Sequence, residues 1–131
     1  MIPPAERSGG RETLSRVSVL GGGARPVILI DFTGLGPETV FPVIEEARRE
    51  IRSRPPKSVD TVTKTTGASF NSEVIAALKE WAAGNEPHVH QAAIVGLSGM
   101  QRIVLSAVSH FTGRSFLLCD SVEEAQRRLA T

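Results

Sequence analysis

The first third of the chain predicts a β-hairpin followed by a helix. Apolar positions within 14–20 are typical of a short strand, and three glycines at 21–23 supply a tight turn. The run PVILIDF at 26–32 is continuously apolar up to Asp31, which is typical of a strand covered on both faces. We therefore expect a hairpin whose second strand lies at the centre of a sheet.

The rest of the chain alternates strands and helices. Apolar residues at three- and four-residue spacing predict helices that begin near residue 37, at Asn71 or Ser72, after residue 98 and at Asp120 or Ser121. Short apolar or β-branched runs predict strands at 57–64, 88–96 and 115–119. The inward face of the helix after residue 98 is predicted to carry Met100, Ile103, Val104, Ala107, Val108 and Phe111.

This alternation predicts the α/β fold class. We expect a mostly parallel β-sheet of about four parallel strands plus an antiparallel N-terminal edge strand, flanked by about four α-helices. One domain covers residues 13–131, and the Pro-, Gly- and Ser-rich segment 1–12 is predicted to be a flexible tail. Ligands gather beyond the carboxyl ends of parallel strands, so the turns at 31–37, 64–72 and 96–100 are expected to share one rim.

Composition and charge exclude several classes of protein. A chain of 131 residues is long enough for one domain core and too short for two. Its net charge of +1 creates no long-range field that would attract nucleic acid or an anionic membrane. Its single cysteine cannot form an internal disulfide. No apolar run has the length of a membrane span, so we expect a cytoplasmic protein.

Hydroxyl-bearing residues and glycines dominate the predicted rim. Helix N-termini with free N–H groups bind phosphate or carboxylate, and a hydroxyl placed there can receive a phosphoryl group. The same residue types also cap helices and form turns, which explains them without any ligand. The candidate ligand or partner residues of the rim are Asp31, Thr33, Gly34, Gly67, Asn71, Ser98 and Gly99, and its candidate phosphoacceptors are Thr65, Thr66, Ser69 and Ser72.

The sequence offers few groups for catalysis. Asp31 follows a strand as the nucleophilic aspartate of phosphoryl-transfer folds does, but the turns at 64–69 and 96–100 add no carboxylate to hold magnesium. We expect Asp31 to order its loop through hydrogen bonds to the backbone instead. His88 and His90 are predicted to share one strand face, yet two ligands do not make a metal site.

The remaining reactive or aromatic side chains are predicted to be structural. We expect Cys119 to be a small buried hydrophobe, and Trp81 and Phe111 to belong to the core. No acid–base pair, no nucleophile with its base and no set of metal ligands can be assembled from the sequence. It therefore predicts no enzyme and no cofactor.

The order and spacing of three segments carry a family resemblance over roughly residues 14–130. The segments are PVILIDFTGLGPETV, RSRPPKSVDTVTKTTGASFNSEVIAALKEW and AAIVGLSGMQRIVLSAVSHFTGRSFLLCDSVEEAQRRL. Together they resemble the SpoIIAA-like family of the STAS superfamily, whose domains are similar to anti-sigma factor antagonists. The resemblance implies a small sheet flanked by helices with a hairpin edge.

The resemblance also implies a regulatory role. In the better-known antagonists, phosphorylation of a serine at the start of the helix after a central strand switches binding to a partner kinase. The matching region is 65–72, in which Ser72 lies nearest that serine. Asn71 and Ser72 stand where those proteins have a DSSG-like signature, and Lys64 stands at a strand end that is often acidic in relatives.

Two functions are expected from these observations. The first is a non-enzymatic regulatory domain that binds a protein partner through the rim, with a homodimer left open. The alternative is a sensor for a small anionic or lipid-like ligand. An apolar pocket beneath Phe70, Phe111 and Met100 would favour the sensor, whereas a flat, exposed rim would favour the partner-binding domain.

Overall fold

The structure is a computed structural model that describes residues 15–21 and 24–130. The predicted tail at 1–12 lies outside the described residues. The elements, in chain order, are β1 (Val17–Leu20), β2 (Val27–Asp31), α2 (Pro37–Arg52), β3 (Val59–Lys64), α3 (Ser72–Asn85), the 3₁₀ helix η1 (Glu86–His88), β4 (Val89–Val95), α4 (Gly99–Thr112), β5 (Leu117–Cys119) and α5 (Val122–Leu129).

The five strands form one sheet in the order β1-β2-β3-β4-β5. β1 pairs antiparallel with β2 in a hairpin, and the other three pairs are parallel. Each parallel connection passes through a helix, because a parallel pair needs a long crossover. The predicted fold class is confirmed in the described part of the chain, including the antiparallel edge strand.

The prediction that the strand at 26–32 lies at the sheet centre is wrong. The middle strand is β3, which has a parallel partner on each side. The sequence did not indicate the central position of β3 because this strand contains polar residues. Asp60, Thr61 and Thr63 are nevertheless all buried. The Asp60 carboxylate finds its partners in the neighbouring strand β4. It accepts a hydrogen bond from the Gln91 N–H (3.0 Å) and lies 3.1 Å from His90 Nδ1.

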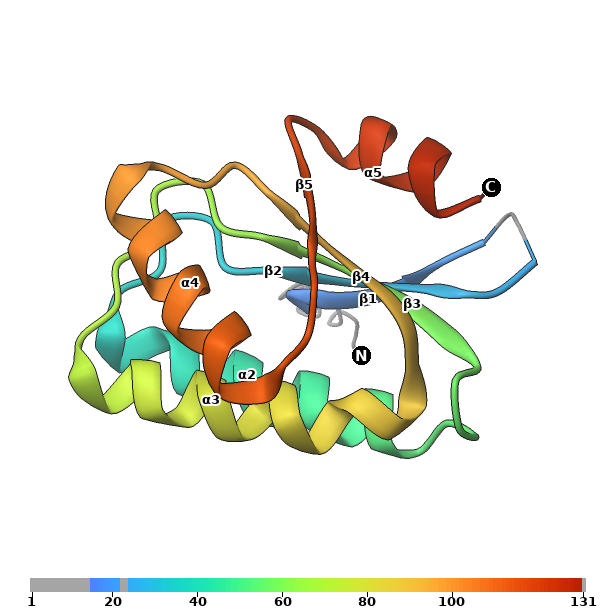
Figure 1. Ribbon diagram of the computed structural model, residues 1–131, viewed down its shortest axis with the longest axis horizontal. Helices are drawn as coiled ribbons and strands as arrows, with labels where there is room; N and C mark the ends of the chain where they lie inside the picture. Colours follow the sequence, from blue (N-terminus) through green and yellow to red (C-terminus); the bar gives the residue numbers. More distant parts are fainter. Residues whose placement is uncertain (1–14, 22–23, 131) are drawn as a thin grey trace, which may run out of the picture.

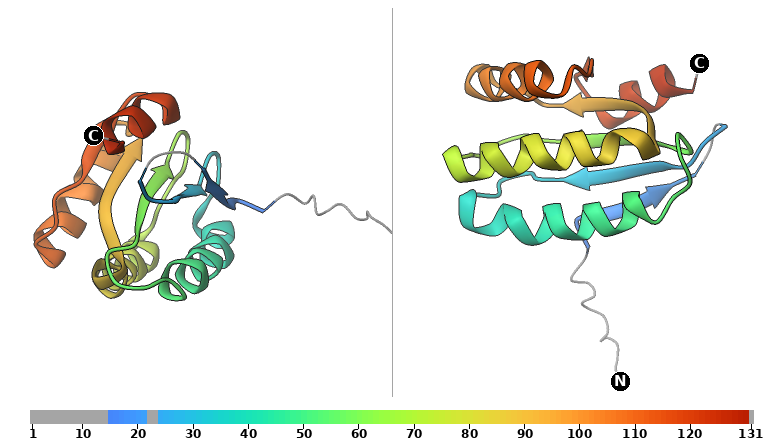
Figure 2. Two further views of the ribbon diagram at one scale, coloured as in Figure 1. Left: turned by 90° about the vertical axis from the view of Figure 1, so that its right-hand side faces the viewer. Right: turned by 60° about the horizontal axis from the view of Figure 1, so that its bottom comes forward.

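The sheet has a thick layer on one side and a thin layer on the other (Figure 1, Figure 2). α2, α3 and α4 cover one face, where they pack around Phe32 and the isoleucines of β2. α5 covers part of the other face through Ala125 and Leu129. Among the described residues, no helix is both long enough and apolar enough to cross a membrane.

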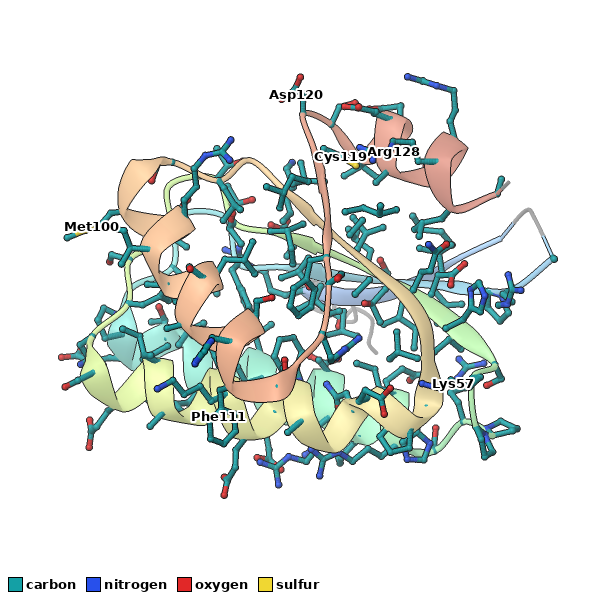
Figure 3. The ribbon with its side chains drawn as sticks, in the orientation of Figure 1. Lys57, Met100, Phe111, Cys119, Asp120 and Arg128 are labelled. Carbon is teal, nitrogen blue, oxygen red and sulfur yellow. The ribbon has the colours of Figure 1, made fainter. Side chains whose placement is uncertain are left out.

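The predicted inward face of α4 is wrong in part. Val108 is buried and Val104 packs against the core, as predicted, but Met100, Ile103 and Phe111 are 74%, 67% and 59% exposed. Figure 3 shows the side chains of Met100 and Phe111 on the outside of the molecule. The side chain that turns inward in their place is Gln101, which is 5% exposed. Hydrogen bonds made by Gln101 fix the rotation of the helix, so the prediction that Phe111 is a core residue is also wrong.

Candidate functional site

Three loops that follow β2, β3 and β4 lie together at one end of the sheet, and we call residues 32–36, 65–71 and 96–98 the rim (Figure 1). The Gly34 N–H donates to the Thr66 carbonyl (2.9 Å), which joins the first two loops. The Thr65 N–H donates to the Val95 carbonyl (2.9 Å), which joins the second loop to the end of β4. The expectation that these turns share one rim is confirmed.

Each loop of the rim contains one glycine with a positive φ. The angles are +71° at Gly34, +71° at Gly67 and +81° at Gly96, and residues with a Cβ atom rarely adopt this region of φ. A Cβ on Gly96 would also collide with Thr66 Oγ1. Gly96 therefore allows the second and third loops to approach each other, which explains a glycine at this position without invoking a ligand.

Gln101 holds the rim from below, and the sequence analysis did not identify it. Its Nε2 donates to the carbonyls of Thr65 (2.9 Å) and Ala68 (2.5 Å) in the second loop. Its Oε1 accepts from the Ser98 N–H (2.8 Å) at the start of α4. The spacing of Ser98 and Gln101 matches the S-x-x-Q pattern of a capping box, which was the available signal for this residue.

The four candidate phosphoacceptors differ in accessibility. Thr65 is buried and its hydroxyl donates to the Val95 carbonyl (3.0 Å), so it is not available to a kinase in this structure. Thr66, Ser69 and Ser72 are exposed. Because Ser72 is the first residue of α3, its backbone lies in the positive end of the helix dipole.

Asn71, Ser98 and Gly99 lie at helix starts, as predicted. Asn71 caps α3, since its Oδ1 accepts from the Val74 N–H (2.9 Å). Ser98 is the residue before α4 and Gly99 is its first residue, and both are exposed. Capping therefore accounts for Asn71, whereas the exposed Ser98 belongs to the outer surface of the rim and the exposed Gly99 lies directly beside it.

Asp31 and Thr33 order the first loop. Asp31 Oδ1 accepts from the Thr33 N–H (2.9 Å), as predicted for a loop-ordering carboxylate, while Arg16 Nη1 donates to the Thr33 carbonyl (2.8 Å). Burial raises the pKa of Asp31, but hydrogen bonding from Thr33 and the charges of Arg16 and Lys64 together outweigh burial and lower it. Asp31 is thus held in its ionised form beside the rim.

A cavity of about 80 Å³ lies beneath the rim, between the sheet and helices α3 and α4. One water molecule needs about 10–15 Å³ of such space, so the cavity has room for several waters or for a small organic group. Phe70 lines it, as the sensor hypothesis expected, but Met100 and Phe111 do not. The other apolar side chains of its wall include Ile30, Phe32, Leu78, Trp81, Ile94, Leu97, Val104, Leu105, Val108 and Phe116.

Polar groups interrupt the apolar wall of the cavity. Thr61 and Thr63 alternate along β3 and line the cavity, and they are only 6% and 7% exposed. Among the described residues, the indole Nε1–H of Trp81, which also lines the cavity, is a buried donor without a hydrogen-bond partner. A buried donor without a partner is costly, so Trp81 Nε1 favours the presence of an acceptor atom in the cavity.

His88, His90 and Cys119 contact other parts of the fold rather than one another. His88 lies in η1 rather than in the strand, where its Nδ1 is 2.8 Å from the Arg54 carbonyl. His90 Nδ1 lies 3.1 Å from Asp60 Oδ1, and Cys119 is buried. Residues 15–21 and 24–130 contain no group of three or more His, Cys, Asp or Glu side chains that could hold a metal ion.

Two comparisons of the sequence with known proteins found no match. No protein-family model matches the chain. No curated protein matches it significantly in sequence either.

Proposed function

We propose that this protein is a non-enzymatic regulatory domain that binds a small, mainly apolar ligand in the cavity beneath the rim. The apolar cavity itself carries the proposal, because close-packed interiors contain few voids larger than a water molecule. The hydroxyls of Thr61 and Thr63 give the ligand a polar point of attachment.

Gln101 provides a route from the cavity to the surface. It lines the cavity and also donates hydrogen bonds to the rim at Thr65 and Ala68. A ligand that displaces α4 changes the lengths of these two hydrogen bonds and therefore moves the second loop of the rim. The rim is therefore the surface through which occupancy of the cavity would be read by a partner.

Binding is tested with neutral apolar probes and a variant that fills the cavity. Ala92 is buried in β4 and lines the cavity, so Ala92→Leu reduces the space, whereas Ala83→Leu lies on the exposed side of α3 and is the matched control. We expect octanol to raise the melting temperature of the natural chain and of Ala83→Leu but not of Ala92→Leu. Equal effects in all three proteins would contradict the proposal.

A second candidate function, a phosphorylation-switched interaction domain, is favoured by the exposure of Ser72. Phosphoserine at the first position of α3 places a dianion in the positive end of a 14-residue helix, which the fold tolerates. We also propose, from the sequence resemblance, that the chain is related to the SpoIIAA-like family. That relationship implies this switch and a cytoplasmic protein partner. A second copy of the chain is the alternative partner.

This second function is tested by intact and peptide mass spectrometry of the protein purified from its own host. A phosphate on Ser72, Ser69 or Thr66 would support the switch. If the chain carries no phosphate both when it is recovered bound to its partner and when it is recovered free, the switch is contradicted.

A further inference from the structure

Arg114 connects the cavity with an open groove on the surface. It lies in the loop between α4 and β5 and lines both spaces, together with Leu105 and Phe116. These three side chains form the boundary between an apolar interior and a polar exterior. A ligand that passes this boundary would have its apolar part inside and its polar end at Arg114.

Arg114 lacks an acidic partner at close range. Its Nη1 donates to the Ala82 carbonyl (2.9 Å), and its guanidinium lies 5.1 Å from the centre of the Phe116 ring. In the described part of the chain, no carboxylate comes within ion-pair distance of it. Burial lowers the pKa of Arg114, and the charge of Glu86 opposes this effect only in part. A half-buried cation without a carboxylate at ion-pair distance is stabilised when an anion binds.

The groove beside Arg114 has the chemistry of an anion site. Its wall includes Arg102 and the hydroxyl-bearing residues Ser106 and Ser115, and no acidic residue lines it. Ser109 is already engaged, since its hydroxyl donates to the Arg114 carbonyl (2.5 Å) and so fixes the loop. Guanidinium groups bind carboxylate and phosphate through paired hydrogen bonds, which a neutral ligand head cannot match.

We propose that the ligand is an amphiphilic organic anion, with its hydrocarbon part in the cavity and its carboxylate or phosphate at Arg114. This inference rests on the proposed function, because it names the class of molecule that occupies the same cavity. The hydroxyls of Thr61 and Thr63 lie deeper, on the sheet side of the cavity, so a ligand with a second polar atom along its chain fits better than a plain hydrocarbon.

The test compares straight-chain carboxylates from butyrate to octanoate with the alcohols of the same lengths, by isothermal titration of the full chain at neutral pH. We expect each carboxylate to bind about tenfold more tightly than its alcohol, or more, because a hydrogen bond to a charged group adds that much affinity. We also expect carboxylate binding to weaken at high salt and alcohol binding to stay constant.

Variants assign the difference to Arg114. Arg114→Gln should lower the ratio of carboxylate affinity to alcohol affinity to near one, and Arg114→Lys should retain part of this ratio. Arg49→Gln, on the exposed side of α2, is the control for an arginine away from the groove. Because Arg114 also bonds Ala82, the comparison of carboxylate with alcohol on the natural chain tests the proposal even if Arg114→Gln unfolds.

The outcomes separate this inference from the function on which it depends. Alcohols and carboxylates that bind equally well would overturn the anion site and leave the cavity proposal intact. Binding of neither series would overturn both. A carboxylate preference that Arg114→Gln leaves unchanged, in a folded variant, would overturn the role of Arg114.

Discussion

The side-chain amide of Gln101 donates a 2.9 Å hydrogen bond to the main-chain carbonyl of Thr65, at the point where β3 leaves the sheet. This bond joins the first turn of α4 to the loop after the central strand. Both residues are buried, and no side chain other than that of Gln101 makes hydrogen bonds to both Thr65 and Ala68 among the described residues. One polar side chain therefore determines how α4 sits over the cavity.

Replacing Gln101 with leucine should destabilise the protein by about 2–4 kcal/mol, since the Ala68 carbonyl loses its side-chain donor, the Thr65 carbonyl is left with the Ala68 N–H, and the Ser98 N–H loses its acceptor. Urea unfolding monitored by circular dichroism measures the change. Ser106→Ala, at an exposed position of the same helix, is the control and should change the free energy of unfolding by less than about 0.5 kcal/mol. Equal effects of both substitutions would show that Gln101 does not anchor α4.

The glycines of the rim can be tested in the same way. Gly96→Ala should cost about 1–3 kcal/mol, because φ is +81° and the added Cβ would collide with Thr66 Oγ1. Gly99→Ala is the matched control, since nothing lies within 4 Å of its Cβ and it begins a helix. We expect Gly99→Ala to be neutral or slightly stabilising. Thermal unfolding of the two variants measures the difference, and similar melting temperatures would contradict the close approach of the loops.

The lowered pKa of Asp31 predicts that the free energy of unfolding depends weakly on pH. Its pKa in the folded protein lies below the ordinary value of 3.8, so its ionised form stabilises the fold above that pH, and the contribution is lost as pH falls through the lowered pKa. Asp31→Asn should therefore be less stable than the natural chain at neutral pH, by less than about 1 kcal/mol because the carboxylate is partly exposed. Urea unfolding at neutral and strongly acidic pH should show this difference disappear in acid.

The elements were predictable because their signals are local. Strand and helix periodicity follows from backbone geometry, and the predicted caps Asn71 and Ser121 each accept a backbone N–H in the structure. The meeting of the three loops also followed, since parallel strands bring their carboxyl ends to one edge. The central place of β3 did not follow, because its buried Asp60 bonds to residues of β4 that lie 30 or more positions away.

The candidate site was less predictable than the fold. A cavity depends on how side chains from separate elements fill space, and no sequence pattern records that volume. Arg114 lies in a loop with no motif, and its position between cavity and groove follows only from the packing of α4 against α3, where Arg114 bonds the Ala82 carbonyl. The rotation of α4 was ambiguous because apolar residues occur around most of its circumference, so periodicity alone could not choose between the two faces.

That rotation gives the last prediction, which compares two apolar residues of α4. Ile103 is 67% exposed and Val108 is 6% exposed, although the sequence predicted both to be buried. Ile103→Ala should change the free energy of unfolding by less than about 0.5 kcal/mol, whereas Val108→Ala should cost about 2 kcal/mol from lost burial and the space left behind. Urea unfolding of the two variants measures this. A larger cost at Ile103 than at Val108 would mean that α4 is rotated toward the face predicted from the sequence, and that Gln101 faces solvent rather than the rim.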